Sequence, residues 1–571
     1  MSPAAVDSDG DPSATPSPAS AAAAALLTAL VGRGVRDVVL SPGSRSQALA
    51  LAAVAFDRAG LLRAHVRVDE RAAAFTALGI GRETGVPAAV ICTSGTAAAG
   101  FLPAAMEAFH SGVPLLLLTA DRPPELRGVG ANQATVQPGM YRAWVRFEAD
   151  APTAGDADPV VHAELAVAAV DAALGLSGTG IPGVAGPAHL NLPFRSPLSG
   201  VLPDPLDVVV GEAPAPTQGV PFRLEQGPRT VVVAGAGAGG RAEEIAHEGG
   251  WPLIAEIVSG ARFGRRLVHG YRELLRDPAL GGRIERVVVL GHPTLSREVA
   301  ALLARDDVAV VAVDGGGERV DPSGRAIGVP AVEVAPGETD RAWLDAWMRA
   351  SAEAARDALD APAPDTDGLS SAVAAERLGA VRAELDAIRR PLDRALLVDA
   401  LWRATWPHDR LVFGSSRLVR VADEILPGKR VPVHANRGLA GIDGTIATAT
   451  GVALASQAGG APGVTRALLG DLAFLHDVGS LLLPADEPAP RIQVVVGNDG
   501  GGTIFDGLEV AGSAAPADLD RAFYTPHAVG IEHLALAYGW RYRRIATRSA
   551  LDQALTGPVA GPEIIEVPLA R

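Results

Sequence analysis

Short apolar runs alternate with alanine-rich stretches along the first third of the chain. The runs DVVLSPGS, AVICTSGTAAAG and VPLLLLTADRPPE lie between Asp37 and Leu192, with stretches of helical composition among them. This alternation is typical of parallel strands that are joined by helical crossovers. Gly, Ser, Pro and Asp follow the apolar part of each run. Polar residues therefore stand at the carboxyl ends of the predicted strands, where open α/β sheets bind their ligands.

The same pattern of strands occurs twice more along the chain. A second unit contains the predicted strands TVVVAGAG (230–237), WPLIAEIV (251–258), RVVVLGHP (286–293) and DVAVVAVDGG (307–316). A third unit contains RLVFGSS, VTRALLGDLAF and RIQVVVGNDGGG. The first and third units share the layout of a strand followed by Gly or Ser, which is compatible with a duplication. We therefore predict an α/β protein of three Rossmann-like domains with mostly parallel sheets.

Proline-rich stretches without helical periodicity separate these units and are typical of linkers. The predicted division is a disordered leader at 1–20, a first domain at 21–196, a linker at 197–222, a second domain at 223–360, a linker at 361–375 and a third domain at 376–571.

The composition argues against some classes of binding partner and some cellular compartments. A chain of 571 residues, 48% of them hydrophobic, can bury roughly three or four domain cores. Its formal net charge of -15 argues against a nucleic-acid or anionic-membrane partner. Cys92 is the only cysteine, so no intrachain disulfide is possible, and a buried thiol is expected. The first twenty residues do not resemble a secretory signal, and the apolar run 21–32 is too short to span a bilayer. We expect a cytoplasmic protein without a membrane span.

The strongest chemical signal is a pair of polar residues at two predicted strand ends in the third unit. Asp471 stands in GDLAFLHD, and Asn498 follows it by 27 residues in VVVGNDGGGTIF. A carboxylate, an amide oxygen and the main-chain carbonyl of Gly500 are hard oxygen ligands that suit Mg²⁺. Such an ion neutralises a diphosphate, whose oxygens also accept backbone N–H groups at the start of a helix.

This pair resembles the signature of thiamine-diphosphate-dependent enzymes: Gly-Asp, then about twenty-seven residues, then Asn. The resemblance implies metal ligation by Asp471, Asn498 and the carbonyl of Gly500, with Mg²⁺ or Mn²⁺ as the ion. Two departures leave alternatives open. Asp499 directly follows Asn498, so a shift of one residue would make Asp499 the ligand. Ala473 stands where a hydroxyl residue often contacts the diphosphate.

Glu70 is the candidate catalytic residue in RVDERAAAFTALGIGRETG (67–85), where it begins an alanine-rich helix after a short strand. Taken alone, it is an acidic residue favoured at a helix start by the macrodipole. The resemblance implies that its carboxyl binds the aminopyrimidine ring of thiamine diphosphate and promotes proton transfer there. It also implies that Glu70 of one subunit serves the diphosphate domain of another, in a homodimer or homotetramer.

Other cofactor contacts follow from the same resemblance. Taken alone, Ile442 is an ordinary buried aliphatic residue; in the family such a side chain wedges beneath the cofactor and bends it. The domain at 21–196 would bind the pyrimidine ring, and the domain at 376–571 the diphosphate. The implied cofactor-binding residues are Glu70, Ser416, Arg437, Ile442, Gly470, Asp471, Leu472 and Asn498.

Turns that carry arginine narrow the resemblance to one reaction. SPGSRSQAL (41–49), TADRPPELRGVGANQATVQPGM (119–140), GSSRLVR (414–420) and HANRG resemble the 2-succinyl-5-enolpyruvyl-6-hydroxy-3-cyclohexene-1-carboxylate (SEPHCHC) synthase family of menaquinone biosynthesis, from Ala21 to Arg571. The implied transferase activity decarboxylates 2-oxoglutarate and adds the product by conjugate addition to isochorismate, without release of pyruvate at this step. Both substrates are dicarboxylates, which guanidinium groups bind bidentately. The implied substrate contacts are Ser44, Arg45, Arg122, Gln133, Arg297, Ser416, Arg420, Arg437, Ile504 and Phe505.

Two rival interpretations stay open at this point. An acetohydroxyacid-synthase-like enzyme or a flavin-using pyruvate oxidase of the same fold would bind FAD in its middle domain, and its purified protein would be yellow. AGAGAGG (234–240) resembles a dinucleotide loop, but it is not a clean G-x-G-x-x-G. A non-catalytic protein of this fold is the other rival. The joint presence of Glu70, Asp471 and Asn498 argues against it.

Overall fold

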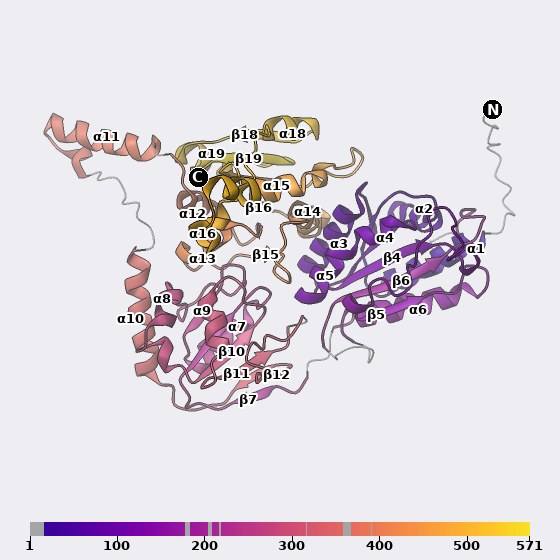
Figure 1. Cartoon of the computed structure of the whole chain (residues 1–571), viewed down its shortest axis with the longest axis horizontal. Helices are drawn as coiled ribbons and strands as arrows, with labels where there is room; N and C mark the ends of the chain where they lie inside the picture. The colour runs from indigo at the N-terminus through magenta and orange to yellow at the C-terminus, as the bar shows by residue number, and fades with distance from the viewer. Residues whose placement is uncertain are drawn as a thin grey trace. The chain divides into compact units, whose positions relative to one another are not determined.

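The computed structural model describes residues 16–176, 183–203, 208–215, 219–315, 317–357, 367–389 and 391–571. The chain forms two compact units. The first comprises residues 1–81, 85–108 and 113–216, and the second comprises 82–84, 109–112 and 217–571. Figure 1 colours the first unit indigo to purple. Each unit is described by itself.

The first unit is built on a six-stranded sheet, and all of its strand pairs are parallel. The strand order is β2-β1-β3-β4-β6-β5. The strands are β1 (Asp37–Leu40), β2 (Arg63–Val66), β3 (Ala88–Cys92), β4 (Leu115–Asp121), β5 (Phe147–Asp150) and β6 (Pro187–Pro193). The helices are α1 (Pro18–Gly32), α2 (Gln47–Arg58), α3 (Glu70–Thr84), α4 (Thr96–Gly100), α5 (Leu102–Ser111) and α6 (Pro159–Ala173).

One face of this sheet packs against α1, α2 and α6 in a single core. Alternate strand residues such as Leu116 and Leu118 point into that core together with Leu27, Phe56 and Val170 from the three helices. The other strand positions are also buried, so the strands are covered on both faces, as parallel strands usually are. Cys92, the last residue of β3, is a free and buried thiol, as predicted.

The first helix begins within the predicted leader. Ser17 caps α1, because its side chain accepts a hydrogen bond from the backbone N–H of Ser20, and Pro18 takes the first helical position. Residues 18–20 therefore belong to α1 and not to the leader predicted at 1–20. Residues 1–15 of that leader lie outside the described residues.

The described part of the second unit contains two larger sheets and one two-stranded sheet, all with parallel strands. The strand order of the five-stranded sheet is β12-β11-β10-β8-β9. Its strands are β8 (Thr230–Ala234), β9 (Leu253–Ala255), β10 (Arg286–Leu290), β11 (Ala309–Val313) and β12 (Ile327–Val329). A separate two-stranded pair joins β7 (Phe222–Leu224) and β13 (Val332–Val334). The helices of this part are α7 (Arg241–Gly249), α8 (Tyr271–Arg276), α9 (Arg297–Leu303) and α10 (Arg341–Asp357).

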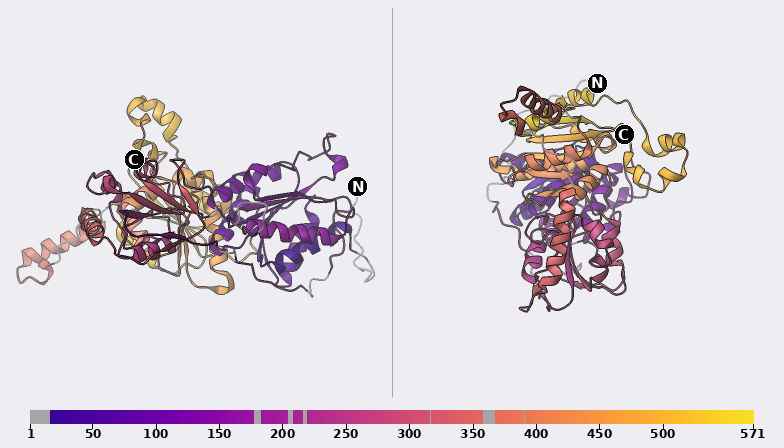
Figure 2. Two further views of the ribbon diagram at one scale, coloured as in Figure 1. Left: turned by 90° about the horizontal axis from the view of Figure 1, so that it is seen from below. Right: turned by 90° about the vertical axis from the view of Figure 1, so that its left-hand side faces the viewer.

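The other sheet of the second unit has six strands in the order β15-β14-β16-β17-β19-β18. They are β14 (Arg410–Phe413), β15 (Val433–Ala435), β16 (Thr465–Gly470), β17 (Ile492–Asn498), β18 (Arg541–Arg544) and β19 (Glu563–Pro568). The right-hand view of Figure 2 shows orange and yellow strands of this sheet next to one another. The longer helices here are α11 (Ala374–Arg389), α12 (Arg394–Ala404), α13 (Arg417–Ile425), α14 (Thr445–Ser456), α15 (Asp471–His476), α18 (Ile531–Ala537) and α19 (Arg548–Thr556). The shorter helical segments α16 (Val510–Ser513) and α17 (Pro516–Leu519) follow β17.

The two six-stranded sheets share one topology. In each, the second strand in chain order lies at an edge, followed by the first, third, fourth, sixth and fifth strands. The α/β fold class is confirmed, and every predicted strand named above overlaps a strand of the structure. The shared order agrees with the duplication that the sequence suggested.

Some segments of the predicted linkers carry secondary structure. The strand β7 begins at Phe222, the last residue of the predicted linker 197–222. The short helical turn Asp367–Ser370 and the start of α11 fall within 361–375. Residues 204–207, 216–218 and 358–366 lie outside the described residues.

Candidate active site

Four neighbouring strands of the second unit end in the polar residues that the sequence singled out. The order β15-β14-β16-β17 places side by side the segments that carry Arg437, Ser416, Asp471 and Asn498. Because all four strands run parallel, these residues follow the same edge of the sheet. Residues up to 82 positions apart in the sequence, Ser416 and Asn498, thus reach one edge.

Asp471 is the buried carboxylate of this edge, with 1% of its surface exposed. Its Oδ1 accepts the backbone N–H of Leu472 at 2.7 Å, and its Oδ2 accepts that of Gly501 at 2.8 Å. Nε2 of His527 lies 3.3 Å from Oδ2. Burial raises the pKa of Asp471, and the charge of Asp499 raises it further, against the opposing effect of the two N–H groups and His527. A cation at this edge would stabilise the ionised carboxylate.

Asn498 and Asp499 are adjacent in the chain but have different partners. Asn498 Oδ1 accepts the N–H of Gly500 at 3.1 Å, and its Nδ2 donates to Glu566 Oε1 at 2.8 Å. Asp499 Oδ2 pairs with Nη2 of Arg394 at 2.6 Å and also accepts the hydroxyl of Thr503. One carboxylate oxygen of Asp499 is therefore already held by a cation and a hydroxyl.

The loop after β17 approaches the backbone of Tyr524 closely, because the loop is rich in glycine. A Cβ atom at Gly501 would lie 2.4 Å from the carbonyl oxygen of Tyr524, and φ at Gly501 is +148°. At Gly500, φ is +73° and nothing lies within 4 Å of an added Cβ. The loop thus adopts a conformation that favours glycine, with open space beside Gly500.

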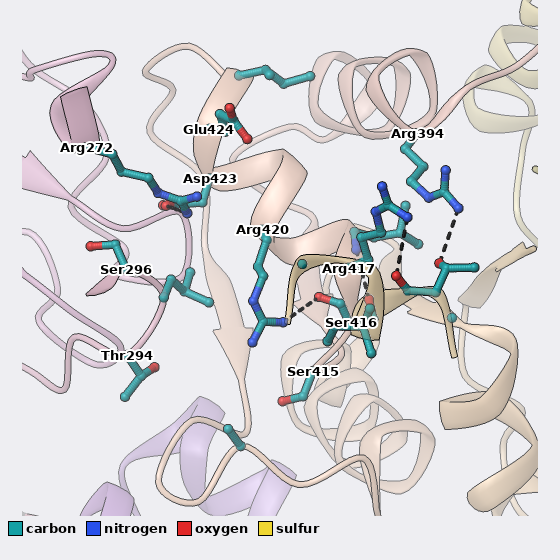
Figure 3. A pocket seen from close by; sticks show the side chains of 18 of the residues that line it. Arg272, Thr294, Ser296, Arg394, Ser415, Ser416, Arg417, Arg420, Asp423 and Glu424 are labelled. Carbon is teal, nitrogen blue, oxygen red and sulfur yellow. Dashed lines mark hydrogen bonds and ion pairs between the residues drawn. The ribbon is translucent and has the colours of Figure 1, made fainter. Parts of the chain in front are cut away.

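A cavity of about 1290 Å³ opens beside this edge (Figure 3). Ten of the residues predicted to contact cofactor or substrate line it: Arg297, Ser416, Arg420, Arg437, Ile442, Gly470, Asp471, Leu472, Ile504 and Phe505. Ile442 is 38% exposed, so it is not the fully buried aliphatic residue of the simplest interpretation. The structure therefore brings these predicted positions to a single cavity.

Arg437 is fixed by contacts on several sides and is only 4% exposed. Its Nε donates to Thr294 Oγ1 at 2.9 Å, its Nη2 to the Thr294 carbonyl at 3.2 Å, and its Nη1 to Ser415 Oγ at 3.2 Å. Glu256 in turn accepts the backbone N–H groups of Thr294 and Leu295, at 3.1 and 2.6 Å. The guanidinium of Arg437 is thus positioned by the segment after β10.

Ser416 immediately precedes α13, and Arg420 lies in its first turn. Ser416 caps that helix, because its Oγ accepts the N–H of Leu418 at 3.2 Å. Arg420 Nη1 donates to the Ser416 carbonyl at 3.3 Å, and Figure 3 shows the Arg420 side chain extended beside Ser416. Burial lowers the pKa of Arg420, and the charge of Arg272 lowers it further. Positive charges therefore gather in this part of the cavity.

Arg297 is less firmly held than these arginines. It begins α9, and its Nη1 lies 3.6 Å from Glu509 Oε1. Both side chains are mostly exposed, at 76% and 83%. An exposed pair of this kind contributes little to stability, so Arg297 can change partners at small cost.

Sequence reasoning missed several residues that line the cavity. Arg394 at the start of α12 pairs with Asp499, Arg417 pairs with Asp506 at 2.7 Å, and Arg272 pairs with Asp423 at 2.7 Å. Figure 3 labels Arg272, Arg394 and Arg417 around the cavity. None of these arginines stands in a local motif with its partner. The arginine of GSSRLVR that was overlooked, Arg417, could have been weighed beside Arg420.

The first unit gathers its predicted residues at the carboxyl edge of its own sheet. The strands β2, β1 and β4 precede the predicted residues Glu70, Arg45 and Arg122, and β3, which lies between β1 and β4, precedes Ser94, which was not predicted. Glu70 begins α3, which Asp69 caps by accepting the N–H groups of Arg71 and Ala72.

The surroundings of Glu70 include a close contact with another helix. A Cβ atom at Gly100 would lie 2.9 Å from Glu70 Cβ, so α4 approaches this glutamate closely. Burial raises the pKa of the Cys92 thiol, and the charge of Glu70 adds to the effect. The carboxylate therefore lies near the end of β3.

The other predicted residues of this unit contact the loops at the same edge. Arg45 Nη1 donates to the Phe194 carbonyl at 2.8 Å, and burial lowers its pKa, with a further contribution from the charge of Arg122. Arg122 holds the Asn132 carbonyl through Nε at 3.0 Å and Nη2 at 2.7 Å.

Gln133 and Ser44 differ in how firmly hydrogen bonds hold them. Gln133 and Ser94 exchange two hydrogen bonds, at 2.9 and 3.0 Å, and φ at Gln133 is 55°. Ser44 is exposed and accepts a bond of 3.4 Å from Gln47. The structure thus places Gln133 and Arg122 against the loops that follow β3 and β4. The Arg45 side chain contacts the segment that follows β6, and Ser44 is open to solvent.

Two kinds of feature are absent from the described part of the chain. No group of three or more His, Cys, Asp and Glu side chains there could hold a metal ion. The predicted ligand set has one carboxylate, one amide and one carbonyl, and so is not of that kind. No helix among the described residues is long and apolar enough to cross a membrane.

Comparisons with known proteins agree with this geometry. Residues 21–140 match the model of the thiamine pyrophosphate enzyme N-terminal TPP binding domain. The chain is similar over 96% of its length to the crystal structure of benzoylformate decarboxylase from Polynucleobacter necessarius, with a TM-score of 0.65, 14% sequence identity and 98% of that chain covered. This likeness shows the fold. Together the family model and the fold place the chain in the class of thiamine-diphosphate-dependent enzymes.

Relatives by sequence narrow the class. The chain is 56% identical to the 2-succinyl-5-enolpyruvyl-6-hydroxy-3-cyclohexene-1-carboxylate synthase of Leifsonia xyli subsp. xyli, with 98% of this chain and 97% of the relative covered. It is 53% identical to the synthase of Clavibacter michiganensis subsp. michiganensis, with the same coverage, and 44% identical to that of Kineococcus radiotolerans, with 97% and 96% covered. The chain belongs to the SEPHCHC synthase family.

Proposed function

We propose that this chain decarboxylates 2-oxoglutarate and couples the remaining four-carbon unit to isochorismate, forming SEPHCHC for menaquinone biosynthesis. Pyruvate is not released at this step. The observation that carries the proposal is the arginine-lined cavity beside Asp471, in a chain that belongs to this synthase family. A cavity of about 1290 Å³ with several fixed guanidinium groups suits two dicarboxylate substrates together with a cofactor.

The cofactor of the proposal is thiamine diphosphate with Mg²⁺, or Mn²⁺ in its place. Asp471, Asn498 and the carbonyl of Gly500 would hold the ion. The donor set fits a hard cation: a buried carboxylate whose pKa is raised by burial, an amide oxygen, and a loop that is open beside Gly500. The pairing of Asp499 with Arg394 and Thr503 favours Asn498 over Asp499 as the second side-chain ligand.

Further contacts of the cofactor are assigned to residues that line the cavity. Gly470 and Leu472 flank Asp471 at the junction of β16 and α15, so their backbone would lie beside a bound diphosphate. The N–H of Leu472 donates to Asp471 Oδ1. Ser416 and Arg437 stand at the ends of β14 and β15, and Ile442 offers an exposed aliphatic surface to the cofactor. When bound, thiamine diphosphate supplies the electron sink for decarboxylation.

Glu70 is the proposed acid–base residue. Its carboxyl would hold a proton in a hydrogen bond to the aminopyrimidine ring and exchange it there. The cap that Asp69 provides fixes the start of α3, so the direction in which Glu70 leaves the helix is set locally. In this proposal Glu70 of one subunit serves the diphosphate-binding region of another, in a homodimer or homotetramer located in the cytoplasm.

Substrate carboxylates are the proposed partners of the arginines. The guanidinium N–H groups of Arg420 and Arg437 lie near the start of α13, where Ser416 adds a hydroxyl group. Ile504 and Phe505 line the same cavity and would contact the apolar part of a substrate. Arg297 would exchange its exposed contact with Glu509 for a carboxylate. Ser44, Arg45, Arg122 and Gln133 complete the proposed set from the first unit.

Product formation tests the proposal directly. The purified chain is incubated with 2-oxoglutarate, isochorismate, thiamine diphosphate and Mg²⁺, and the coupled product is followed by mass spectrometry together with released carbon dioxide. We expect coupled product and carbon dioxide in equal amounts. Carbon dioxide without coupled product would contradict the acceptor, and the absence of both would contradict the proposed reaction. An Asp471→Asn chain is the negative control.

A further inference from the structure

Glu566 lies beside Asn498 on the sheet that carries the proposed metal site. It belongs to β19, between β17, which ends at Asn498, and β18, which carries Tyr542. In the register of these strands Glu566 is opposite Val496 on one side and Arg544 on the other. Residues two positions apart on a strand share a face. Asn498, Glu566 and Tyr542 therefore form a diagonal row on one face of the sheet.

The contacts along this row are short and directional. Glu566 Oε1 accepts a hydrogen bond from Nδ2 of Asn498 at 2.8 Å, and Oε2 accepts one from the hydroxyl of Tyr542 at 2.6 Å. Glu566 is only 8% exposed. Each of its two oxygens thus has a donor on a neighbouring strand, which holds the carboxylate in one orientation.

The chemistry of the carboxylate decides which way the amide of Asn498 faces. An ionised carboxylate only accepts hydrogen bonds, whereas an amide has a donor side and an acceptor side. Only the NH₂ group of Asn498 can face Glu566 favourably, so Oδ1 must face the other way. On that side Oδ1 meets the N–H of Gly500, at the start of the glycine-rich loop.

We propose that Glu566 is a positioning residue, which keeps the amide oxygen of Asn498 turned toward the metal, and that Tyr542 holds Glu566 in place. This inference rests on the metal site of the proposed function. A ligand that is already oriented loses less entropy when the ion binds, and partners of metal ligands typically contribute about 10- to 100-fold to metal affinity.

Metal binding without turnover tests the inference. Free Mn²⁺ is measured by electron paramagnetic resonance as the full chain is titrated in the presence of thiamine diphosphate. We expect Glu566→Gln to weaken Mn²⁺ binding by about 10- to 100-fold, because an amide at position 566 accepts either orientation of Asn498. The matched control is Glu563→Gln, which makes the same change three residues away on the opposite face of β19 and is expected to keep the affinity.

A reciprocal double variant separates orientation from general damage to the sheet. In Glu566→Gln combined with Asn498→Asp, the new amide can donate to the new carboxylate, which presents an oxygen on both of its sides. The Mn²⁺ affinity of this double variant is compared with that of Asn498→Asp alone, because a carboxylate at position 498 adds a charged ligand by itself. We expect Glu566→Gln to weaken Mn²⁺ binding much less in the Asn498→Asp chain than in the unchanged chain. An equal loss in both chains would indicate a merely structural role for Glu566 and would overturn the inference.

Two further variants distinguish failure of the inference from failure of the metal site. Asn498→Ala is expected to lose Mn²⁺ binding; if it binds normally, the proposed metal site itself is wrong. If Asn498→Ala loses binding while Glu566→Gln keeps it, only the positioning role is overturned. Tyr542→Phe removes one donor to Glu566 and keeps the ring, and we expect a smaller loss of affinity. Should Glu566→Gln fail to fold, unchanged affinity in Tyr542→Phe would overturn the inference.

Discussion

Glu70 and Asp69 are neighbouring carboxylates with different predicted roles. Asp69 caps α3, whereas Glu70 is the proposed acid–base residue. We expect Glu70→Gln to lower the rate of product formation by about 10²- to 10⁴-fold, the usual contribution of a general acid or base. Steady-state kinetics at saturating thiamine diphosphate measures the change.

Asp69→Asn is the matched control, because it removes one negative charge from the adjacent residue and keeps a good capping side chain. We expect its rate to stay close to that of the unchanged chain. Equal losses in the two variants would mean that the charge of this helix start matters and the specific carboxyl of Glu70 does not.

Asp499 is expected to support the loop and not to bind the ion. Asp499→Asn weakens the contact with Arg394 and should lower the free energy of unfolding by about 1–3 kcal/mol. Metal affinity should change little, because Asp471 and Asn498 remain. Chemical denaturation and Mn²⁺ titration measure the two quantities. Loss of metal binding in Asp499→Asn would support the one-residue shift that the sequence left open.

Individual residues of the site differ in how far the sequence could predict them. Asp471 and Asn498 stand in a recognisable pair, and the structure places both at neighbouring strand ends. Arg394 and Glu566 carry no such signal, because their partners lie 105 and 68 residues away and no local spacing connects them. Contacts of this kind depend on strand order and on helix packing, which a single sequence leaves open.

At the scale of elements, the loop after β17 depends on Gly501. Gly501→Ala would place a Cβ atom 2.4 Å from the Tyr524 carbonyl at a φ of +148°, a conformation that costs other residues about 1–3 kcal/mol. Because the N–H of Gly501 also donates to Asp471, we expect weaker cofactor binding as well as lower stability. Thermal unfolding with and without thiamine diphosphate and Mg²⁺ measures both.

Gly507→Ala serves as the control in the helical turn that follows. Nothing lies within 4 Å of an added Cβ there. We expect this variant to unfold at nearly the same temperature as the unchanged chain. Equal decreases in unfolding temperature for the two variants would show that alanine is poorly tolerated throughout this loop. They would contradict a specific requirement for glycine at Gly501.

The segments around β9, β10 and α13 meet at a buried pair of acids. Glu256 holds the N–H groups of Thr294 and Leu295, and Asp423 accepts the N–H of Ile257 and the hydroxyl of Tyr271. Burial, together with the charge of Asp423, raises the pKa of Glu256 to about 8 from 4.5. The folded chain therefore binds a proton at Glu256 that the unfolded chain has already released at neutral pH.

This difference gives the sign of a pH dependence. Where the folded state binds more protons, the free energy of unfolding falls as the pH rises. The stabilising contribution of Glu256 is complete below about pH 4.5 and is lost as the pH rises through about 8. We expect Glu256→Gln to remove this part of the dependence, as measured by urea unfolding across that range. An identical pH slope in both chains would contradict the raised pKa.

Sequence patterns predict the presence of a strand better than they predict the residue at which a helix or strand begins. Runs such as RVVVLGHP are apolar throughout, as a strand buried on both faces requires, and β10 lies inside that run. The start of α1 was missed because the cap is a single side chain, Ser17, within a polar stretch. Capping is decided by a few atoms and leaves little trace in hydrophobic periodicity.

At the scale of the whole molecule, two sheets with one strand order provide two edges for ligands. The first unit presents Glu70 at its edge, and the second presents Asp471. The strand-then-Gly/Ser layout indicated this relation, but the order of the strands could not be read from the sequence, since each crossover can return on either side of a strand. That both edges serve one cofactor is the central claim of the proposed function.

Mixed oligomers test that claim most directly. Chains with Glu70→Gln and chains with Asp471→Asn, each inactive alone, are co-expressed, purified as hybrids through two different tags, and assayed for coupled product. A hybrid whose sites combine Glu70 of one subunit with Asp471 of the other contains one intact site, so we predict that activity returns. Hybrids that assemble and bind thiamine diphosphate but stay as inactive as the two parents would contradict the claim.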